Sequence, residues 1–422
     1  MRTHIDFNLR SFIQLLHPDL LVRYLERFQD EYAEQEGRES ALVASVLSTA
    51  SEEGFSAANI KTLVDMTRRP GPLTRLFEGP LRCVNDLNSP RGRACVQREL
   101  CEDVVSIDPE LDPINAGMRL LLDYPDRMRR LLAIYQVEQT EDWIMFRSAE
   151  AAQPDVTDAT AGAIAADFSE ALKSQGLSGR CEATFYAQSE RVIVEIAHEQ
   201  YTEALREFRG GEIEVDWRKP VRHARIVYRP STGLLKVKVF RNSSGLIELL
   251  RGSMGAHLFG WHGQFRHPDA EATFDLSSLS ERPQWTTDPI DQIEDVQVIA
   301  LSFVSAGGSG ATAQFSANNT DDLYRMLGTS SMSLPGVNIL YAGLRFKFPG
   351  RGRTGQRTVY LRGQNSSNLG DDDYDRIIEK YLARWGLLNA PEPPETDLDP
   401  DRRAREAARR MAESRSLFSG IA

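Results

Sequence analysis

Residues 224–240 read Ala224-Arg-Ile-Val-Tyr228, Arg229-Pro-Ser-Thr-Gly233 and Leu234-Leu-Lys-Val-Lys-Val-Phe240. The outer two segments are rich in Val, Ile and aromatic residues, which favour strands, and the middle segment contains the Pro, Ser and Gly typical of turns. We therefore predict a β-hairpin at this place. Apolar residues at helical spacing continue to about residue 258, so a helix at about 244–258 is predicted to follow the hairpin.

The same order of two strands and a helix recurs twice towards the C-terminus. The predicted strand pairs, with the residues near which their helices begin, are Val296–Ala306 and Ala311–Ala317 before Thr320, and Val337–Phe348 and Arg357–Arg362 before Gly370. Two earlier strands are predicted at Ala183–Ala187 and Val192–Ala197. Hairpins join neighbouring antiparallel strands, so the sheets are expected to be mostly antiparallel. The spacings differ between the three units, so a duplicated module is one interpretation and not a conclusion.

The first 150 residues favour helices instead. Leu21, Leu25 and Phe28 recur at the spacing of an amphipathic helix. The same periodicity predicts helices at about 40–50, 56–66, 114–122 and 124–136, and an Ala-rich helix at about 160–174. The predicted fold class is α+β, with a helical N-terminal domain followed by mostly antiparallel β-hairpin/helix units. The predicted domains are 1–152, 160–270 and 271–390, followed by a linker and a C-terminal helix within 391–422.

The composition narrows the class of protein. The chain has 422 residues, of which 41% are hydrophobic and 26% charged, as in an ordinary globular protein. No apolar run approaches the roughly 18–20 residues of a membrane helix, and the first residues do not resemble a signal peptide. The four cysteines, Cys83, Cys95, Cys101 and Cys181, contain no C-x-x-C pair, so reduced thiols are expected. We expect a cytoplasmic protein without membrane contact. Its basic residues are mostly Arg, which suggests a bacterial coding bias.

Charge is distributed unevenly along the chain. The net charge is −11, yet Trp217–Ile247 and Leu323–Gly370 contain no Asp or Glu. The basic residues that we consider as candidate nucleic-acid contacts in these two stretches are Arg218, Lys219, Arg222, Arg225, Arg229, Lys236, Lys238, Arg241, Arg345, Lys347, Arg351, Arg353, Arg357 and Arg362. Basic residues on hairpins can follow a phosphate backbone, and such local charge dominates affinity for nucleic acid.

Aromatic residues lie between these basic residues. They are Trp217, Tyr228, Phe240, Phe346, Phe348 and Tyr360, and stacking on single strands requires such interleaving. We therefore predict a protein that binds nucleic acid or another polyanion through basic β-hairpins. The competing interpretation is that the aromatic residues fill the sheet core while the basic residues pair with acids of the N-terminal domain.

Two further functions remain open. The chain could be a non-catalytic subunit of a multiprotein assembly, with a predicted helix at about 401–415 as its docking segment for a protein partner. It could also be a metal-dependent nuclease, since Glu212, Glu214 and Asp216 followed by Lys219 are residue types that such chemistry uses. Alternating acids on a solvated strand explain these residues equally well. We assume no catalysis and predict no cofactor.

Three other patterns support no site. Gly350-Arg-Gly352-Arg-Thr-Gly355 fits a dinucleotide fingerprint, but it joins two predicted strands where the fingerprint needs a strand and a helix. His257, His262, His267 and Asp269 lack the helical spacing of metal ligands, so no metal site is predicted. Asp371-Asp-Asp373 precedes a predicted helix, where acids complement the helix dipole and need no further role.

Overall fold

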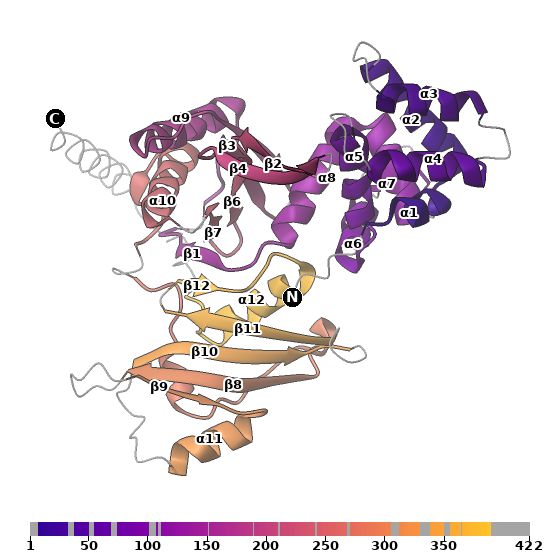
Figure 1. Cartoon of the computed structure of the whole chain (residues 1–422). Coiled ribbons are helices and arrows are strands. Elements are labelled where there is room, and N and C mark those ends of the chain that lie inside the picture. Colours follow the sequence, from indigo (N-terminus) through magenta and orange to yellow (C-terminus); the bar gives the residue numbers. More distant parts are fainter. Residues whose placement is uncertain are drawn as a thin grey trace. The chain divides into compact units, whose positions relative to one another are not determined.

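The computed structural model describes residues 7–32, 38–49, 55–68, 74–100, 107–108, 111–150, 152–188, 190–209, 212–240, 243–267, 271–304, 312–329, 338–349, 355–363 and 365–389. Contacts divide the chain into two units, Met1–Gln139 and Thr140–Ala422. Figure 1 shows that the first unit is helical and that the second combines a sheet with helices. The α+β fold class is confirmed.

The first unit contains helices only, among the residues described. They are α1 (Leu9–Leu15), α2 (Pro18–Tyr32), α3 (Arg38–Thr49), α4 (Ala57–Arg68), α5 (Thr74–Asp86), α6 (Pro90–Leu100), α7 (Pro113–Asp123) and α8 (Pro125–Glu138). Proline begins four of them, where its missing N–H has no helical partner to lose. The helices predicted at 40–50, 56–66, 114–122 and 124–136 are confirmed. Helix α5 contains Pro80 in its interior, which explains why helical spacing alone did not predict it.

A buried thiol lies between α6 and α8. The Cys95 Sγ donates to Glu138 Oε2 over 3.1 Å, and the Arg98 Nη2 contacts both Cys95 Sγ and Glu138 Oε1, at 3.2 and 2.7 Å. Burial raises the pKa of the Cys95 thiol to about 12, and the negative charge of Glu138 adds to the effect. A thiol with so high a pKa is almost entirely protonated at neutral pH, and only the thiolate is a strong nucleophile.

We therefore expect Cys95 to resist alkylation in the folded protein. Iodoacetamide at pH 8, followed by mass spectrometry of the peptides, should label Cys95 at least ~10-fold more slowly in buffer than in urea. The unfolded protein is the control for intrinsic reactivity. Equal rates in buffer and in urea would show that the thiol is neither buried nor protonated as described.

The second unit is built on a ten-stranded antiparallel sheet, within the described residues. Its strand order is β2-β3-β6-β7-β1-β12-β11-β10-β8-β9. The strands are β1 (Trp143–Arg147), β2 (Cys181–Ala187), β3 (Val192–Glu199), β6 (Val221–Arg229), β7 (Leu234–Lys238), β8 (Asp295–Val304), β9 (Thr312–Ser316), β10 (Asn338–Lys347), β11 (Gln356–Arg362) and β12 (Ser366–Ser367). Its helices are α9 (Asp158–Ser174), α10 (Ser244–Phe259), α11 (Thr320–Thr329) and α12 (Asp373–Arg384).

The three predicted hairpin–helix units are all present. They are β6–β7 with α10, β8–β9 with α11, and β10–β11 with α12. Strand β12 lies between β11 and α12 and was not predicted. Both predicted ranges 160–270 and 271–390 contribute strands to the one sheet, and their boundaries as separate domains stay a prediction. A separate two-stranded sheet, β4 (Glu203–Arg209) with β5 (Glu212–Arg218), falls between β3 and β6 in the chain.

Strand β1 joins the two halves of the sheet. It pairs with β7 from Ile144 to Arg147 and with the short β12 through Trp143 and Ile144. Sequence analysis did not predict this strand. Its pairing joins the first half of the sheet, β2, β3, β6 and β7, to the second half, β8 to β12. The sheet is therefore continuous across all three hairpin–helix units.

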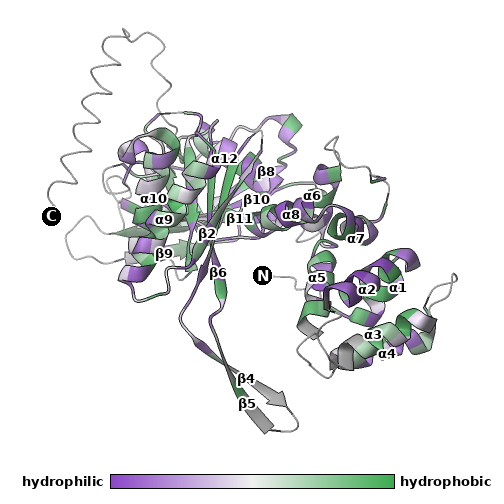
Figure 2. Ribbon diagram, turned by 90° about the horizontal axis from the view of Figure 1, so that it is seen from above, coloured by the Kyte–Doolittle hydropathy of each residue, from purple (hydrophilic) through white to green (hydrophobic). Residues whose placement is uncertain are grey.

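The two faces of the sheet are covered differently. Helices α9 and α10 lie side by side (Figures 1 and 2) on one face of the first half, over a core that includes Val194, Ile226 and Val237. Helix α12 lies on the opposite face and spans the junction, since it contacts β6 and β7 as well as β10 and β11. No helix of the described residues is long and apolar enough to cross a membrane.

Candidate nucleic-acid interface

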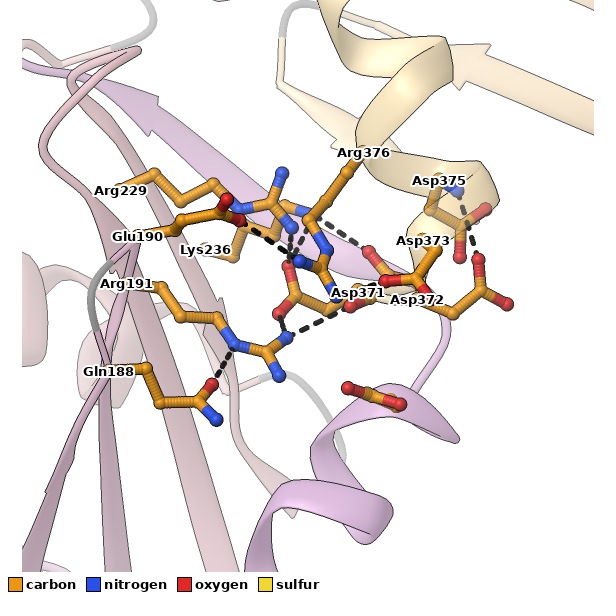
Figure 3. A network of polar contacts seen from close by, with 12 residues as sticks. Gln188, Glu190, Arg191, Arg229, Lys236, Asp371, Asp372, Asp373, Asp375 and Arg376 are labelled. Carbon is orange, nitrogen blue, oxygen red and sulfur yellow. Dashed lines mark hydrogen bonds and ion pairs between the residues drawn. The ribbon is translucent and has the colours of Figure 1, made fainter. Parts of the chain in front are cut away.

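Two of the basic residues of Trp217–Ile247, the first stretch without Asp or Glu, are buried. Arg229 at the end of β6 and Lys236 in β7 are 5% and 0% exposed. Both side chains contact the carboxylate of Asp371, which precedes α12, and that of Glu379 within α12. Arg191, which directly precedes β3, also contacts Asp371. Figure 3 shows Arg191, Arg229 and Lys236 converging on Asp371. We call these five residues the charge cluster.

Additional hydrogen bonds complete the charge cluster. The Lys236 Nζ donates to the Gly370 carbonyl over 2.7 Å and to Asp371 Oδ1 over 3.2 Å, and the Arg191 Nη1 donates to the Asp371 carbonyl over 2.9 Å. Burial alone would raise the pKa of Asp371, but the charges of Arg229, Lys236 and Arg191 outweigh burial and hold that pKa far below its usual range. Buried ions need such partners, because an isolated buried charge is very costly. The cluster therefore fastens α12 to the sheet.

The other basic residues of this stretch also have partners within the second unit. The Arg225 Nε donates to Glu195 over 3.3 Å, and Lys238 donates to the Asp142 carbonyl over 3.0 Å. Arg222 lies over the ring of Phe240. Lys219 is exposed, whereas the side chain of Arg218 and all of Arg241 lie outside the described residues. The acids that pair with Arg225, Arg229 and Lys236 thus belong to the second unit, and not to the N-terminal domain as the competing interpretation expected.

The aromatic residues divide between core and surface. Tyr228, Phe346 and Phe348 are at most 2% exposed and fill the core, as the competing interpretation expected. Phe240 and Tyr360 are partly exposed. The side chain of Trp217 lies outside the described residues. Only part of the predicted stacking set is therefore available to a ligand.

Strands β10 and β11 present a different surface on the face opposite α12. Alternate residues of each strand share this face, and the register pairs Tyr341 with Arg362, Gly343 with Tyr360, and Arg345 with Thr358. We call this surface the tyrosine face, with the residues Tyr341, Gly343, Arg345, Lys347, Thr358, Tyr360 and Arg362. All except the buried Gly343 are exposed or partly exposed. Sequence analysis missed Tyr341 and Gly343, although their period of two with Arg345 and Lys347 was a usable signal.

Two tyrosine rings and a guanidinium are grouped at one end of this face. The rings of Tyr341 and Tyr360 have centroids 5.6 Å apart and are inclined by only 17°. The Arg362 Cζ lies over the Tyr360 ring, 5.7 Å from its centroid. A Cβ added to Gly343 would lie 3.3 Å from Cδ1 and Cε1 of Tyr360. The absence of a side chain at Gly343 therefore lets the edge of the Tyr360 ring approach the sheet.

The basic residues of the tyrosine face are only weakly engaged. The Arg345 Nη1 donates to the Asn318 carbonyl over 3.0 Å. Lys347 pairs with Glu294 at 3.0 Å, and Arg362 pairs with Asp142 at 3.2 Å. All four side chains of these two ion pairs are about half exposed, and exposed ion pairs contribute little free energy. A phosphate can therefore compete for these cations.

The remaining basic residues of the second stretch are not part of the tyrosine face. Arg357 lies on the opposite face, where it contacts Asp372 beside the start of α12. Arg351 and Arg353 lie outside the described residues, as do the other residues of the fingerprint-like segment except Gly355. That segment connects β10 to β11, as predicted.

The histidines do not converge. The His257 Nε2 lies 2.9 Å from Asp167 Oδ2, the His262 Nδ1 lies 3.2 Å from the Gly252 carbonyl, and the His267 Nε2 lies 3.6 Å from Glu248. Asp269 is outside the described residues. Across the part of the chain that is described, no group of His, Cys, Asp and Glu could hold a metal ion.

The residues of the other two candidate functions are only partly described. Glu212, Glu214 and Asp216 lie in β5, opposite Arg209, Glu207 and Leu205 of β4, but their side chains are outside the described residues. The predicted docking helix at 401–415 is also outside them. The described residues therefore test neither the nuclease hypothesis nor the assembly-subunit hypothesis.

No model of a protein family matches the sequence, and no curated protein matches it either. The function must therefore be argued from the residues themselves.

Proposed function

We propose that this protein binds nucleic acid through the tyrosine face of β10 and β11. The observation that carries the proposal is the line of Tyr341, Arg345 and Lys347 along β10, beside Tyr360 and Arg362 of β11, on a partly exposed sheet face. Basic side chains supply the phosphate contacts that dominate affinity for nucleic acid. The first basic hairpin is not included, because Arg229 and Lys236 are buried and Arg225 is paired.

The proposed place of action is the bacterial cytoplasm. Support comes from the abundance of Arg over Lys in the sequence and from the free thiols of Cys83, Cys95 and Cys181 among the described residues. Free thiols are typical of reducing compartments. No catalysis is included in the proposal.

Salt dependence tests the proposal. Purified protein is titrated against a fluorescent oligonucleotide at several salt concentrations, and the logarithm of the affinity is plotted against that of the salt concentration. The triple variant Arg345→Gln/Lys347→Gln/Arg362→Gln is expected to weaken binding and to reduce the slope of that plot by about 2–3, because each lost phosphate contact contributes about 0.7–0.9.

A second triple variant controls for net charge. Arg180, Arg282 and Arg325 are 81%, 63% and 72% exposed and do not belong to the tyrosine face, so their replacement by Gln removes the same charge elsewhere. The binding of this control variant should retain most of the salt dependence that wild-type protein shows. The proposal fails if wild-type protein does not bind at low salt, or if both triple variants lose the same slope.

A further inference from the structure

We infer that the ligand of the tyrosine face is a single strand, whose unpaired bases stack on Tyr341 and Tyr360 while its phosphates contact Arg345 and Lys347. This inference rests on the proposed function and adds to it the class of nucleic acid. Three features support it: the two rings, the arrangement of charge on β10 and β11, and Gly343 opposite Tyr360.

The two rings offer flat surface to a planar ligand. They are nearly parallel and both are partly exposed. Within the described part of the chain, neither tyrosine hydroxyl makes a hydrogen bond, so no polar contact explains why the rings lie at the surface. Burial raises the pKa of Tyr341, and the neighbouring Tyr360 adds to the effect; the hydroxyl therefore stays neutral at physiological pH. In a duplex the faces of the bases are stacked on one another, and only unpaired bases can stack on aromatic side chains.

The cations of the tyrosine face lie along its two strands, with Arg345 and Lys347 on β10 and Arg362 opposite Tyr341 on β11. Residues 341, 343, 345 and 347 share one face of β10, so each is about 7 Å from the next along the strand. Acids border the line: Lys347 is paired in register with Asp295 and contacts Glu294, and Arg362 contacts Asp142. These carboxylates would repel the second strand of a duplex. A line about 20 Å long with acids at its ends suits the backbone of a few nucleotides in a single strand.

Gly343 holds the rings in this arrangement. An added Cβ would lie 3.1 Å from the Ala300 Cβ and 3.3 Å from the edge of the Tyr360 ring. Both distances are tighter than ordinary van der Waals contact, so a side chain at this position would press on the edge of the Tyr360 ring. The glycine is therefore a positioning residue for the stacking surface, and it makes no contact with the ligand.

The test compares single strands with duplexes. The probes are labelled 15-mers of thymidine and of uridine, and a labelled 15-base-pair DNA duplex; affinities are compared at one low salt concentration, and each titration is repeated at higher salt to obtain the slope. Wild-type protein should bind the single strands at least ~10-fold more tightly than the duplex. Tyr360→Ala should weaken single-strand binding by about 5- to 100-fold, the usual loss for one stacked base. Tyr360→Phe keeps the ring and should stay within about 2-fold of wild type.

One additional variant and a stability measurement protect the test against a folding defect. Tyr341→Ala removes the second ring and is expected to give a loss of similar size, and the urea midpoint of each variant shows whether it is folded. Because no charge is lost, Tyr360→Ala should leave the salt slope unchanged. Equal binding of duplex and single strand, or equal affinities of Tyr360→Ala and Tyr360→Phe, would overturn the inference and leave the proposed function intact. Absence of salt-dependent binding to every probe would overturn the proposed function itself.

Discussion

Asp371→Asn is expected to lower the free energy of unfolding of the second unit by about 3–5 kcal/mol. The carboxylate is fully buried and contacts Arg191, Arg229 and Lys236. An amide of the same shape keeps the space filled but removes the negative charge that the three buried cations share. Urea unfolding followed by circular dichroism measures the difference.

Asp373→Asn is the matched control. This neighbouring carboxylate is 64% exposed and pairs with Arg376, so its replacement should change the free energy of unfolding by less than about 0.5 kcal/mol. If the two variants were equally stable, the charge cluster would contribute nothing to the fold.

The stability that Asp371→Asn loses should depend on pH in a defined direction. The pKa of Asp371 in the folded protein lies below that of the unfolded chain, where it is about 3.9. The stabilisation by its carboxylate is therefore fully present above about pH 3.9 and is lost as the pH falls through the folded pKa. The stability difference between wild type and Asp371→Asn should stay constant from pH 7 to about pH 4 and shrink only below that.

Gly255→Ala is expected to destabilise the second unit by about 1–3 kcal/mol. Gly255 is buried in α10, and a Cβ there would lie 2.6 Å from the Trp261 carbonyl oxygen and 3.2 Å from that of His262. Backbone atoms cannot swing aside as a side chain can, so the turn after α10 would have to move. The same urea unfolding experiment measures this loss.

Gly252→Ala, three residues earlier in the same helix, is the control. A Cβ at Gly252 would meet only the His262 Nδ1, at an ordinary 3.7 Å. Alanine favours helices over glycine by up to about 1 kcal/mol, so this variant should be as stable as wild type or more so. Loss of stability in both variants would point to a general intolerance of α10 and not to the contact with Trp261.

Features that depend on neighbouring residues could be predicted from the sequence. The hairpin–helix units follow from alternation, turn residues and helical spacing within about 40 residues, and each of these is local. Strand β1 could not be predicted, because five residues without turn signals gain their structure from partners far away, such as Val237 and Ser367. Its pairing is a property of the folded sheet.

The charge cluster was hidden for the same reason. Asp372 has the role that the sequence suggested for this acidic run, since its side chain caps α12 by accepting from the Asp375 N–H over 2.9 Å. Asp371 has a different role, and its partners Arg191, Arg229 and Lys236 are 180, 142 and 135 residues away. Nothing in a local pattern distinguishes the two neighbouring carboxylates.

The candidate interface was predictable in part. The absence of acids identified β10 and β11 as basic, and the alternation of residues could have separated Arg345 from Phe346. Which face α12 covers could not be read from the sequence, because it depends on the buried contacts of Asp371 and Glu379. The charge content of the sequence therefore overestimated how many cations of the first hairpin, β6–β7, are available to a ligand, because these cations are largely paired.

The charge cluster also orders events during synthesis of the chain. Arg229 leaves the ribosome 142 residues before Asp371, an interval of roughly 7–28 s at about 5–20 residues per second. During that time the first half of the sheet has three cations without their carboxylates, and β1 has an open edge awaiting β12. Strand β12 supplies the missing strand pairing, and Asp371, which follows it closely in the chain, supplies the shared carboxylate. A chain that stops before β12 therefore leaves the three cations and the edge of β1 without their partners at the same time.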